Sequence, residues 1–270
     1  MRLEFIPGYH IEFYQLSRIV DLCLKNNIRN KIPSTLFIDD LGLQKNQFGF
    51  FARALSAFGV IKSHSFILTK FGYMVAINDS FFEDLKTLCI CHYNISSNPD
   101  NYVWYRFINS ILPKIENNVH SDFTEYYTDV SELVSGKSAK KKVSKEISSI
   151  LDIYTNQNFK KLKLFFKDYE NYYQKDDGVE LDHIVFLYLL LVFKDNLEIN
   201  ATALTIEEII HTERSPARVF HLDRYKVNDL LNKLHSQQLI SLENFGDLDQ
   251  VRFNQNIDKN ILLKKIYNKD

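Results

Sequence analysis

The sequence predicts a mainly α-helical protein with an N-terminal winged helix-turn-helix, a central helical bundle and a C-terminal winged-helix-like module. Apolar residues recur at helical spacing along most of the 270 residues. Only 8 glycines and 5 prolines interrupt this pattern, which is too few for a many-stranded sandwich. In two places, three helical segments are followed by two short strand-like segments. We therefore predict domains at residues 1–78, 79–195 and 196–270.

Composition limits the class of protein. With 45% hydrophobic and 25% charged residues, the chain is typical of a globular protein rather than a disordered one. A formal net charge of -1 argues against a globally cationic nucleic-acid binder, but a local basic face remains compatible with it. The 3 cysteines form no CxxC pair, which favours reduced thiols in the cytoplasm. No apolar run reaches the roughly 18 residues of a membrane span, so we expect neither secretion nor membrane insertion.

The N-terminal domain is predicted from three helices and a hairpin. The helices cover Ile11–Ile28, Ser34–Gly42 and about Gln44–Phe58, and strand residues Ile61 and Ile67 then flank a polar turn. This is the element order of a winged helix-turn-helix. In that fold the third helix can enter the major groove of DNA while the hairpin contacts the flanking backbone.

Candidate DNA contacts follow from this arrangement. The buried stripe of the third helix is predicted to be Phe48, Phe51, Ala52 and Leu55. The opposite face would present Asn46, Gly49, Phe50 and Arg53, with Lys45 and Gln47 at the amino end, and Lys62, His64 and Lys70 would contact the DNA backbone from the wing. The alternative is a scaffolding or protein-docking module, in which these side chains form an ordinary solvated face.

The centre of the chain, Thr87–Pro113, is predicted to be two helices folded about a corner. Asn98 is the expected N-cap of the second helix and Pro99 its first residue, and Pro113 should stop it. Trp104 lies on the apolar stripe of this helix, whereas Tyr102, Tyr105 and Asn109 would line a wetter stripe.

Two side-chain types in this centre could serve DNA chemistry. His92 falls on an apolar stripe, which favours a core histidine over a catalytic or phosphate-facing one. Tyr93, Tyr102 and Tyr105 could stack on flipped or single-stranded bases, although most of the aromatic residues must pack in the core.

The same centre resembles a known family. The string TLCICHYNISSNPDNYVWYRFIN, together with LGLQKNQFGFFARALSAFGVI and LTKFG upstream, resembles the bacterial DUF4007 family over about Phe5–Tyr154. Cys89 stands where the family usually has tryptophan, and Tyr105-Arg106 replaces a more aromatic run. The residues that match the central motif are His92, Tyr93, Asn98, Pro99, Trp104, Tyr105 and Asn109.

The resemblance implies a function and partners. It points to the B component of Ssp-type DNA phosphorothioation systems, which defend bacteria against phage, with DNA nicking as a proposed activity. The implied partners are DNA, sulfur-transfer enzymes of the ATP pyrophosphatase-like type, and ATPases. A homodimer is also compatible with it. No cofactor is predicted, except magnesium if the protein is a nuclease.

A lysine-rich run opens a later helix. Lys137, Lys140, Lys141, Lys142 and Lys145 precede or interleave with the buried stripe that begins at Val143. Cations at a helix amino terminus oppose the macrodipole, and a DNA phosphate would offset that cost. We therefore include Lys140, Lys141 and Lys142 among the candidate DNA contacts, the alternative being a solvated lysine cluster.

The C-terminal module is predicted to start after a boundary near the turn at residues 174–178 and a buried helix at Leu181–Phe193. Thr205 with Glu208 forms a capping box, and Ser215 and Asp223 cap two further helices before a hairpin. The hairpin carries Glu243, Asp247 and Asp249, which would repel phosphate. We expect this module to dock proteins or to dimerise.

No local catalytic signature is evident. Asp84-Leu85-Lys86 has the spacing of some metal-dependent nucleases, but Leu85–Ile95 already reads as a core helix. Glu180, Asp182 and His183 cluster at the start of a buried helix, where acids are expected in the first turn as partners of the helix dipole. Three functions remain open: a DNA-binding, possibly nicking, component of a phosphorothioation system; a winged-helix transcription regulator; and a non-catalytic adaptor for a sulfur-transfer or ATPase partner.

Overall fold

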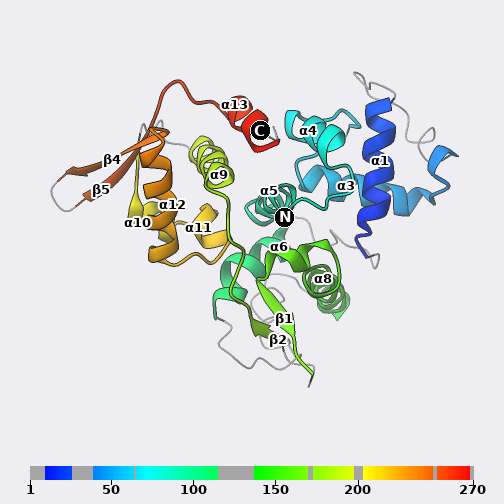
Figure 1. Cartoon of the computed structure of the whole chain (residues 1–270). Coiled ribbons are helices and arrows are strands. Elements are labelled where there is room, and N and C mark those ends of the chain that lie inside the picture. Colours follow the sequence, from blue (N-terminus) through cyan, green and yellow to red (C-terminus); the bar gives the residue numbers. More distant parts are fainter. Residues whose placement is uncertain are drawn as a thin grey trace. The chain divides into compact units, whose positions relative to one another are not determined.

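The computed structural model describes residues 10–25, 39–63, 65–114, 137–169, 173–197, 203–245 and 248–267. Contacts between Cα atoms group the chain into two compact units, Met1–Asp177 and Gly178–Asp270 (Figure 1). The division falls at the polar turn where the sequence indicates a boundary. The fold is mainly helical with small sheets, as predicted. The three-domain division remains a prediction.

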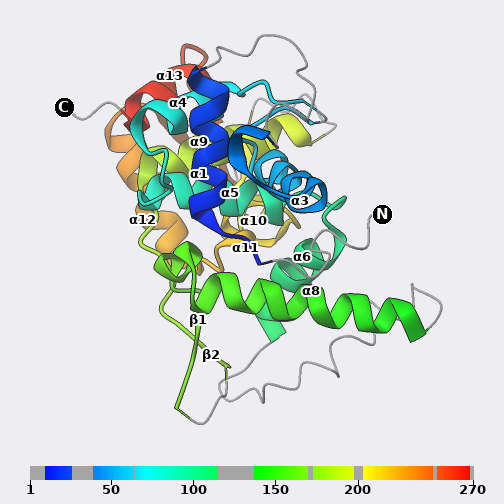
Figure 2. The ribbon, with the colours of Figure 1, turned by 90° about the vertical axis from the view of Figure 1, so that its right-hand side faces the viewer.

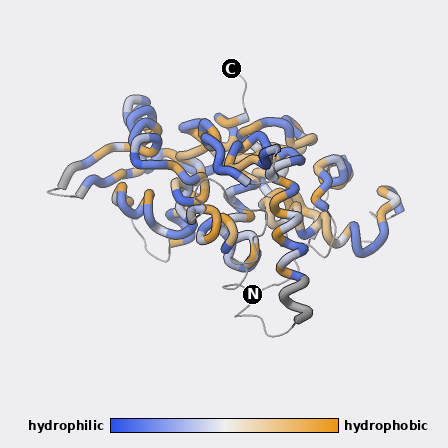
Figure 3. The backbone as a smooth tube through the Cα atoms, turned by 90° about the horizontal axis from the view of Figure 1, so that it is seen from below, coloured by the Kyte–Doolittle hydropathy of each residue, from blue (hydrophilic) through white to orange (hydrophobic). Residues whose placement is uncertain are grey.

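The described residues of unit 1 form mostly helices, together with a two-stranded antiparallel sheet of β1 (Phe165–Lys167) and β2 (Tyr173–Lys175). The other elements of the unit are α1 (Phe13–Lys25), α3 (Lys45–Ala57), α4 (Lys70–Asn78), α5 (Leu85–Ser96), α6 (Tyr102–Arg106), η1 (Phe107–Ile111), η2 (Leu112–Lys114), α8 (Lys137–Thr155) and η4 (Asn158–Leu162). Figure 2 shows α8 as a long helix, and Figure 3 shows hydrophobic and hydrophilic residues interleaved along the tube, as amphipathic helices require. None of the described helices is long and apolar enough to cross a bilayer.

The core of unit 1 is an aromatic cluster around Phe159 of η4. Its ring lies 5.6 Å from that of Phe13, 5.4 Å from that of Phe58 and 5.3 Å from that of Tyr154, measured between centroids. All four rings are buried. Residues from α1, from the end of α3, from α8 and from η4 therefore meet in one cluster, which fixes these helices against one another.

The corner between α5 and α6 differs from the prediction. Asn98 Oδ1 accepts a hydrogen bond from the Asp100 amide at 2.9 Å, so residues 98–101 form a turn and the helix begins only at Tyr102, with Asn101 as its N-cap. The chain then winds as a π-helix through η1, and Pro113 lies in the 3-10 turn η2. The expected N-cap role of Asn98 and the helical position of Pro99 are thus wrong, because the Asn98 side chain stabilises a turn instead.

Unit 2 combines helices with a three-stranded antiparallel sheet in the order β3-β5-β4. Its elements are α9 (His183–Asn196), β3 (Ala203–Thr205), α10 (Ile206–His211), α11 (Pro216–Val219), α12 (Arg224–Ser236), β4 (Ile240–Phe245), β5 (Leu248–Phe253) and α13 (Lys259–Tyr267). The predicted caps are confirmed: Thr205 Oγ1 accepts from the Glu208 amide at 3.1 Å, Ser215 Oγ from the Arg218 amide at 3.2 Å, and Asp223 Oδ1 from the Lys226 amide at 2.8 Å.

Candidate nucleic-acid interface

The candidate interface is built from α3, the hairpin that follows it and the start of α4, all within unit 1. Lys45 and Asn46 in the first turn of α3 are exposed, and Gln47 is half-buried. Gln47 Oε1 accepts a hydrogen bond from the Gln44 amide at 3.2 Å, so this side chain serves the helix cap. Lys45 and Asn46 are therefore the side chains at this end of α3 that are open to a ligand.

The hairpin after α3 is short and tight. A single antiparallel bridge joins Ile61 to Leu68, and the Lys62 amide donates to the Ile67 carbonyl at 2.9 Å. The ring of Phe66 packs 5.2 Å from that of Phe48 in α3, measured between centroids. Since Phe48 lies one helical turn after Lys45, this contact holds the hairpin tip, with exposed Lys62, beside the start of α3.

The start of α4 is fixed to the base of the same hairpin. Thr69 Oγ1 donates to the Gly59 carbonyl at 2.6 Å and accepts from the Gly72 amide at 2.9 Å. A Cβ at Gly72 would lie 1.8 Å from the Val60 carbonyl oxygen, so only glycine permits this approach. Lys70, the first residue of α4, is exposed.

Helix α5 anchors the other end of α3. Asn94 Nδ2 donates to the Phe58 carbonyl at 2.9 Å, and a Cβ at Gly59, whose φ is 76°, would lie 2.4 Å from that nitrogen. Gly59 is required here by both its backbone angle and the close approach of Asn94. The helix, the hairpin and the start of α4 are thus held as one rigid platform.

This platform is electropositive. From Leu41 to Asn78 the chain contains Lys45, Arg53, Lys62 and Lys70 and no aspartate or glutamate. Neither α3 nor α4 has an acidic residue in its first turn, although the helix macrodipole favours one there. Lys45, Lys62 and Lys70 form no ion pair with any residue that the structure describes. Their charges are therefore available to an anionic partner.

Arg53 and Phe50 occupy positions that the helical pattern alone could not fix. Arg53 is half-buried, and its Nη1 atom lies 3.8 Å from the position of a Cβ on Gly49, so the guanidinium folds back along α3 towards Lys45. Phe50, expected on the exposed face, is fully buried. That expectation is wrong because α3 packs against both α1 and α5, which covers more of the helix than one stripe.

The remaining candidate cations are only partly described. His64 lies outside the described residues, and so do the side chains of Lys140 and Lys141. Lys142 on α8 is exposed. The described residues therefore concentrate the candidate contacts at Lys45, Asn46, Lys62 and Lys70.

The family-motif residues form a buried hydrogen-bonded network instead of a surface. His92 is buried, as the sequence favours, and its Nδ1 lies 2.6 Å from the hydroxyl oxygen of Tyr154. Trp104 Nε1 donates to the same oxygen at 3.1 Å. Burial raises the pKa of Tyr154, so its hydroxyl stays protonated and can donate to His92. The network joins α5, α6 and α8.

The stripe of Tyr102, Tyr105 and Asn109, which was expected to face solvent, is largely buried. Asn109 is fully buried and its Nδ2 donates to the carbonyls of Ser96 at 2.8 Å and Tyr105 at 3.0 Å. Tyr93 and Tyr105 are buried, and only Tyr102 is partly exposed. Base stacking by Tyr93 of α5 and Tyr105 of α6 is therefore excluded in this conformation, because both rings are buried in the core.

The three cysteine thiols of the chain lie inside unit 1, away from solvent. Cys23, Cys89 and Cys91 are buried free thiols. Burial raises the pKa of Cys23 to about 12, and burial, with the nearby charges of Asp79 and Cys89, holds the pKa of Cys91 well above its ordinary value. These two thiols therefore carry almost no thiolate at neutral pH.

The two acidic groups considered as metal sites act as helix caps. Asp84 Oδ1 accepts from the Lys86 amide at 2.8 Å, and Asp182 Oδ1 accepts from the Ile184 amide at 2.9 Å. Among the described residues, no three His, Cys, Asp or Glu side chains come close enough to hold a metal ion. We assign no magnesium ligands in this part of the chain.

Sequence reasoning missed the parts that hold the platform together. Thr69 and Gly72 lie in the matched string LTKFG and Asn94 in the central motif, but their role in fixing the hairpin depends on close backbone approaches, which leave no periodic signal. The acid-free segment from Leu41 to Asn78 could have been found from the sequence, because a count of charges along the chain shows it.

Comparisons with known proteins agree with this architecture. The model of the DUF4007 family, described as a protein of unknown function, matches residues 37–267. The crystal structure of magnesium ion-bound SspB superposes with a TM-score of 0.73 at 15% identity, covering 96% of this chain and 86% of that chain. Another SspB crystal structure gives a TM-score of 0.72 with the same identity and coverage. A search of curated proteins finds no match.

Proposed function

Since the chain belongs to the DUF4007 family, whose model spans most of its length, we propose that it is a DNA-binding component of a bacterial DNA phosphorothioation system. Two findings support the assignment to such a system. The motif of residues 87–109 resembles the family members found in these systems, and the fold is similar to that of SspB. Contact with DNA is supported by the electropositive platform of unit 1.

The observation that carries the proposal is the distribution of charge on this platform. Three exposed lysines and Arg53 stand in a segment without acids, in a protein whose formal net charge is -1. Lys62 and Lys70 lie at opposite ends of the hairpin, on the order of 10 Å apart for three residues of strand. That distance is about one Debye length at 0.1 M salt, so their fields add at the surface. Phosphates bound there would release condensed counterions.

We place α3 as the helix that enters a groove, in the manner of a winged helix-turn-helix. Lys45 and Asn46 at its amino end would meet the DNA first, and an asparagine amide can donate to and accept from adenine. Lys62 and Lys70 would hold the flanking backbone from the hairpin and from α4. Buried Phe50 takes no part in this contact.

Nicking lies outside this proposal. The family resemblance implies it, and one of the similar structures is of magnesium ion-bound SspB. The described acids that fit the spacing of a nuclease are committed to helix caps, so we derive no step through a metal ion. Supercoiled plasmid incubated with the protein and Mg²⁺ tests nicking directly, through the appearance of the open-circular form.

The proposal is tested by fluorescence anisotropy with a labelled 20-base-pair duplex over a range of salt concentrations. We expect the wild type to bind more weakly as salt rises. The triple variant K45A/K62A/K70A should lose affinity for all duplexes alike. Its slope of log K against log salt should fall by about one for each lysine that contacts a phosphate.

A matched control removes the same number of charges elsewhere. Lys25, Lys233 and Lys259 are exposed and paired with Asp21, Asp229 and Asp195. The triple variant K25A/K233A/K259A should bind duplex like the wild type. Equal losses in the two triple variants would contradict the proposed platform, and so would salt-independent binding by the wild type.

A further inference from the structure

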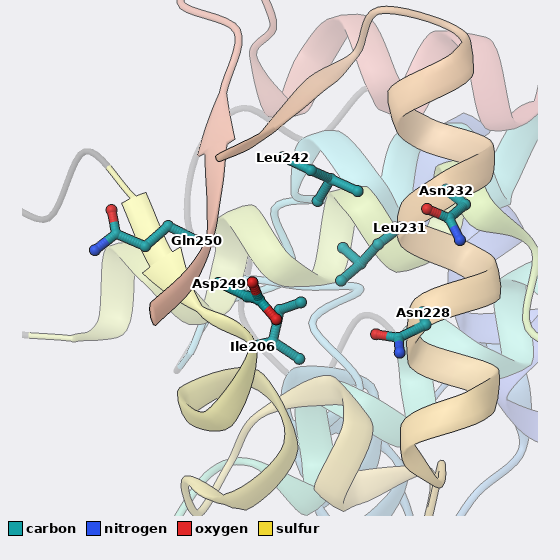
Figure 4. A pocket seen from close by; sticks show the side chains of 7 residues that line it. All are labelled: Ile206, Asn228, Leu231, Asn232, Leu242, Asp249 and Gln250. Atoms are coloured by element: carbon teal, nitrogen blue, oxygen red, sulfur yellow. The ribbon is translucent and has the colours of Figure 1, made fainter. Parts of the chain in front are cut away.

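One carboxylate of unit 2 lies on the face of its strand that is otherwise apolar. Side chains alternate along β5, so Asp249 shares a face with Val251 and Phe253, both of which are buried. Asp249 itself is exposed. Figure 4 shows its carboxylate directed into the space between β5 and α12, whereas Gln250 points away from that space. The alternation of the strand thus places a charge at the open end of the core.

Asp249 lines a pocket of about 220 Å³. Its apolar wall is formed by Ile206, Leu231 and Leu242. Asn228 and Asn232 lie one turn apart on α12 and face the same space (Figure 4). The volume is below the roughly 300–1,000 Å³ of pockets that hold drug-sized ligands, so it suits a single side chain better than a cofactor.

Three other described acids on α10, α12 and β4 already have cationic partners. Glu243 pairs with Arg252 at 2.8 Å, Asp229 with Lys233 at 2.7 Å, and Glu207 with Arg224. The carboxylate of Asp249 forms no ion pair or hydrogen bond with any residue that the structure describes. Its charge is therefore available to a cation.

We infer that this pocket binds an arginine side chain presented by a partner protein. The aliphatic stem would lie on Ile206, Leu231 and Leu242, and the guanidinium would donate to the Asp249 carboxylate. The side-chain oxygens of Asn228 and Asn232 can accept further hydrogen bonds. Arginine fits better than lysine because its planar group carries five donors in a fixed fork.

The pocket of unit 2 is unsuited to DNA, the ligand proposed for the platform of unit 1. A carboxylate at the mouth repels phosphate, so DNA is disfavoured here. The inference concerns a different unit and a ligand of opposite charge, and it does not depend on the proposed DNA binding. Loss of one activity would leave the other unchanged.

The test is an NMR titration of the full ¹⁵N-labelled chain with the peptide acetyl-Gly-Gly-Arg-Gly-Gly-amide. The comparison peptide carries citrulline, which has the shape of arginine without its charge. We expect saturable shifts for the amides of α12 and β5 with the arginine peptide and much weaker ones with the citrulline peptide. D249N should weaken binding about tenfold, as expected for loss of a charged hydrogen-bond partner.

D229N is the matched control. It removes the same charge from α12, but Asp229 is paired with Lys233 and does not line the pocket. This variant should bind the arginine peptide within about twofold of the wild type, because exposed pairs contribute little. Absence of saturable shifts in the wild type, equal binding of the two peptides, or equal weakening in D249N and D229N would each overturn the inference.

Discussion

Each unit of this protein contains a helix followed by a hairpin, and the two versions carry opposite surfaces. In unit 1, α3 and its hairpin carry cations without acids between Leu41 and Asn78. In unit 2, α12 and the β4–β5 hairpin carry both signs, and Lys233 and Arg252 are each paired with an acid. The same order of elements therefore presents a cationic platform in one unit and, in the other, a surface of both signs on which the carboxylate of Asp249 is open.

The two hairpins also differ in how they are held. The β4–β5 ladder runs over six residue pairs from Ile240–Phe253 to Phe245–Leu248, and β3 extends the sheet. The hairpin that follows α3 in unit 1 has one bridge and is held by side chains, through Thr69, Asn94 and the Phe48–Phe66 contact. Strand pairing stabilises the second hairpin, whereas packing and caps stabilise the first.

Reversing two charges on the platform should give the largest change in duplex affinity. A small change would contradict the contrast between the two units. K45E/K62E places two carboxylates where phosphates are proposed to bind, and like-charge contacts cost several kcal/mol, so duplex affinity should fall by about 100-fold or more. Fluorescence anisotropy at low salt measures this. K233E on α12 should change affinity by no more than about threefold, and a comparable loss in K233E would contradict the assignment of DNA binding to unit 1.

The close approach of Gly72 to the Val60 carbonyl tests whether packing holds the hairpin of unit 1. G72A would place a Cβ 1.8 Å from the Val60 carbonyl oxygen, so we expect unit 1 to lose about 3 kcal/mol of unfolding free energy. Urea unfolding followed by circular dichroism measures the change. G49A is the control in α3, where the added Cβ would lie 3.8 Å from Arg53 Nη1, and it should stabilise the helix by about 0.5–1 kcal/mol. A neutral G72A would show that the hairpin can shift.

Loss of the buried hydrogen bonds around Tyr154 should give the next largest effect, a decrease in the unfolding free energy. Y154F removes the hydroxyl that contacts His92 and Trp104, which should lower the unfolding free energy by about 1–3 kcal/mol. Thermal unfolding detects this. Y169F is the control, because Tyr169 is fully exposed and should change stability by less than about 0.5 kcal/mol. Equal effects in the two variants would show that the hydroxyl of Tyr154 contributes nothing.

The smallest effect concerns the paired acid of unit 2. Hydrogen bonding to Arg252 lowers the pKa of Glu243, so the pair stabilises the hairpin above the ordinary pKa of glutamate and is lost as pH falls through the lowered value. R252Q should raise the pKa of Glu243 towards that of an exposed glutamate. A carboxyl ¹³C titration measures it, and an unchanged pKa in R252Q would show that the pair does not form in solution.

The local features of the fold could be predicted from the sequence. Helix caps such as Thr205 with Glu208 and Asp223 depend on neighbouring residues, and the structure confirms them. The failures lie where an element is covered from two sides. Phe50 is buried because α3 meets α1 and α5, and Asn109 of η1 is buried against the end of α5, where its amide donates to the Ser96 carbonyl. A single apolar stripe carries no information about a second neighbour.

The exposed residues of the candidate site could be predicted from the sequence, whereas the long-range contacts of the folded chain could not. Lys45 and Asn46 at the start of α3 and Lys62 in the hairpin are exposed, as expected for the amino end of the third helix and for the wing. The Tyr154–His92 contact joins residues 62 positions apart in the sequence. The pairing of β3 with β5, which places Ala203 opposite Arg252, likewise joins segments that are distant in the sequence. Such long-range contacts depend on the packed tertiary structure and leave no pattern in either segment.

The three buried thiols have a practical consequence. Since Cys23, Cys89 and Cys91 are shielded from solvent, maleimide reagents should leave the folded protein unmodified. A single cysteine introduced at exposed Ser63, beside Lys62, could then carry a fluorophore without removal of the natural thiols. The native chain is thus ready for site-specific labelling, and dye emission at the hairpin tip would report the arrival of a ligand in real time.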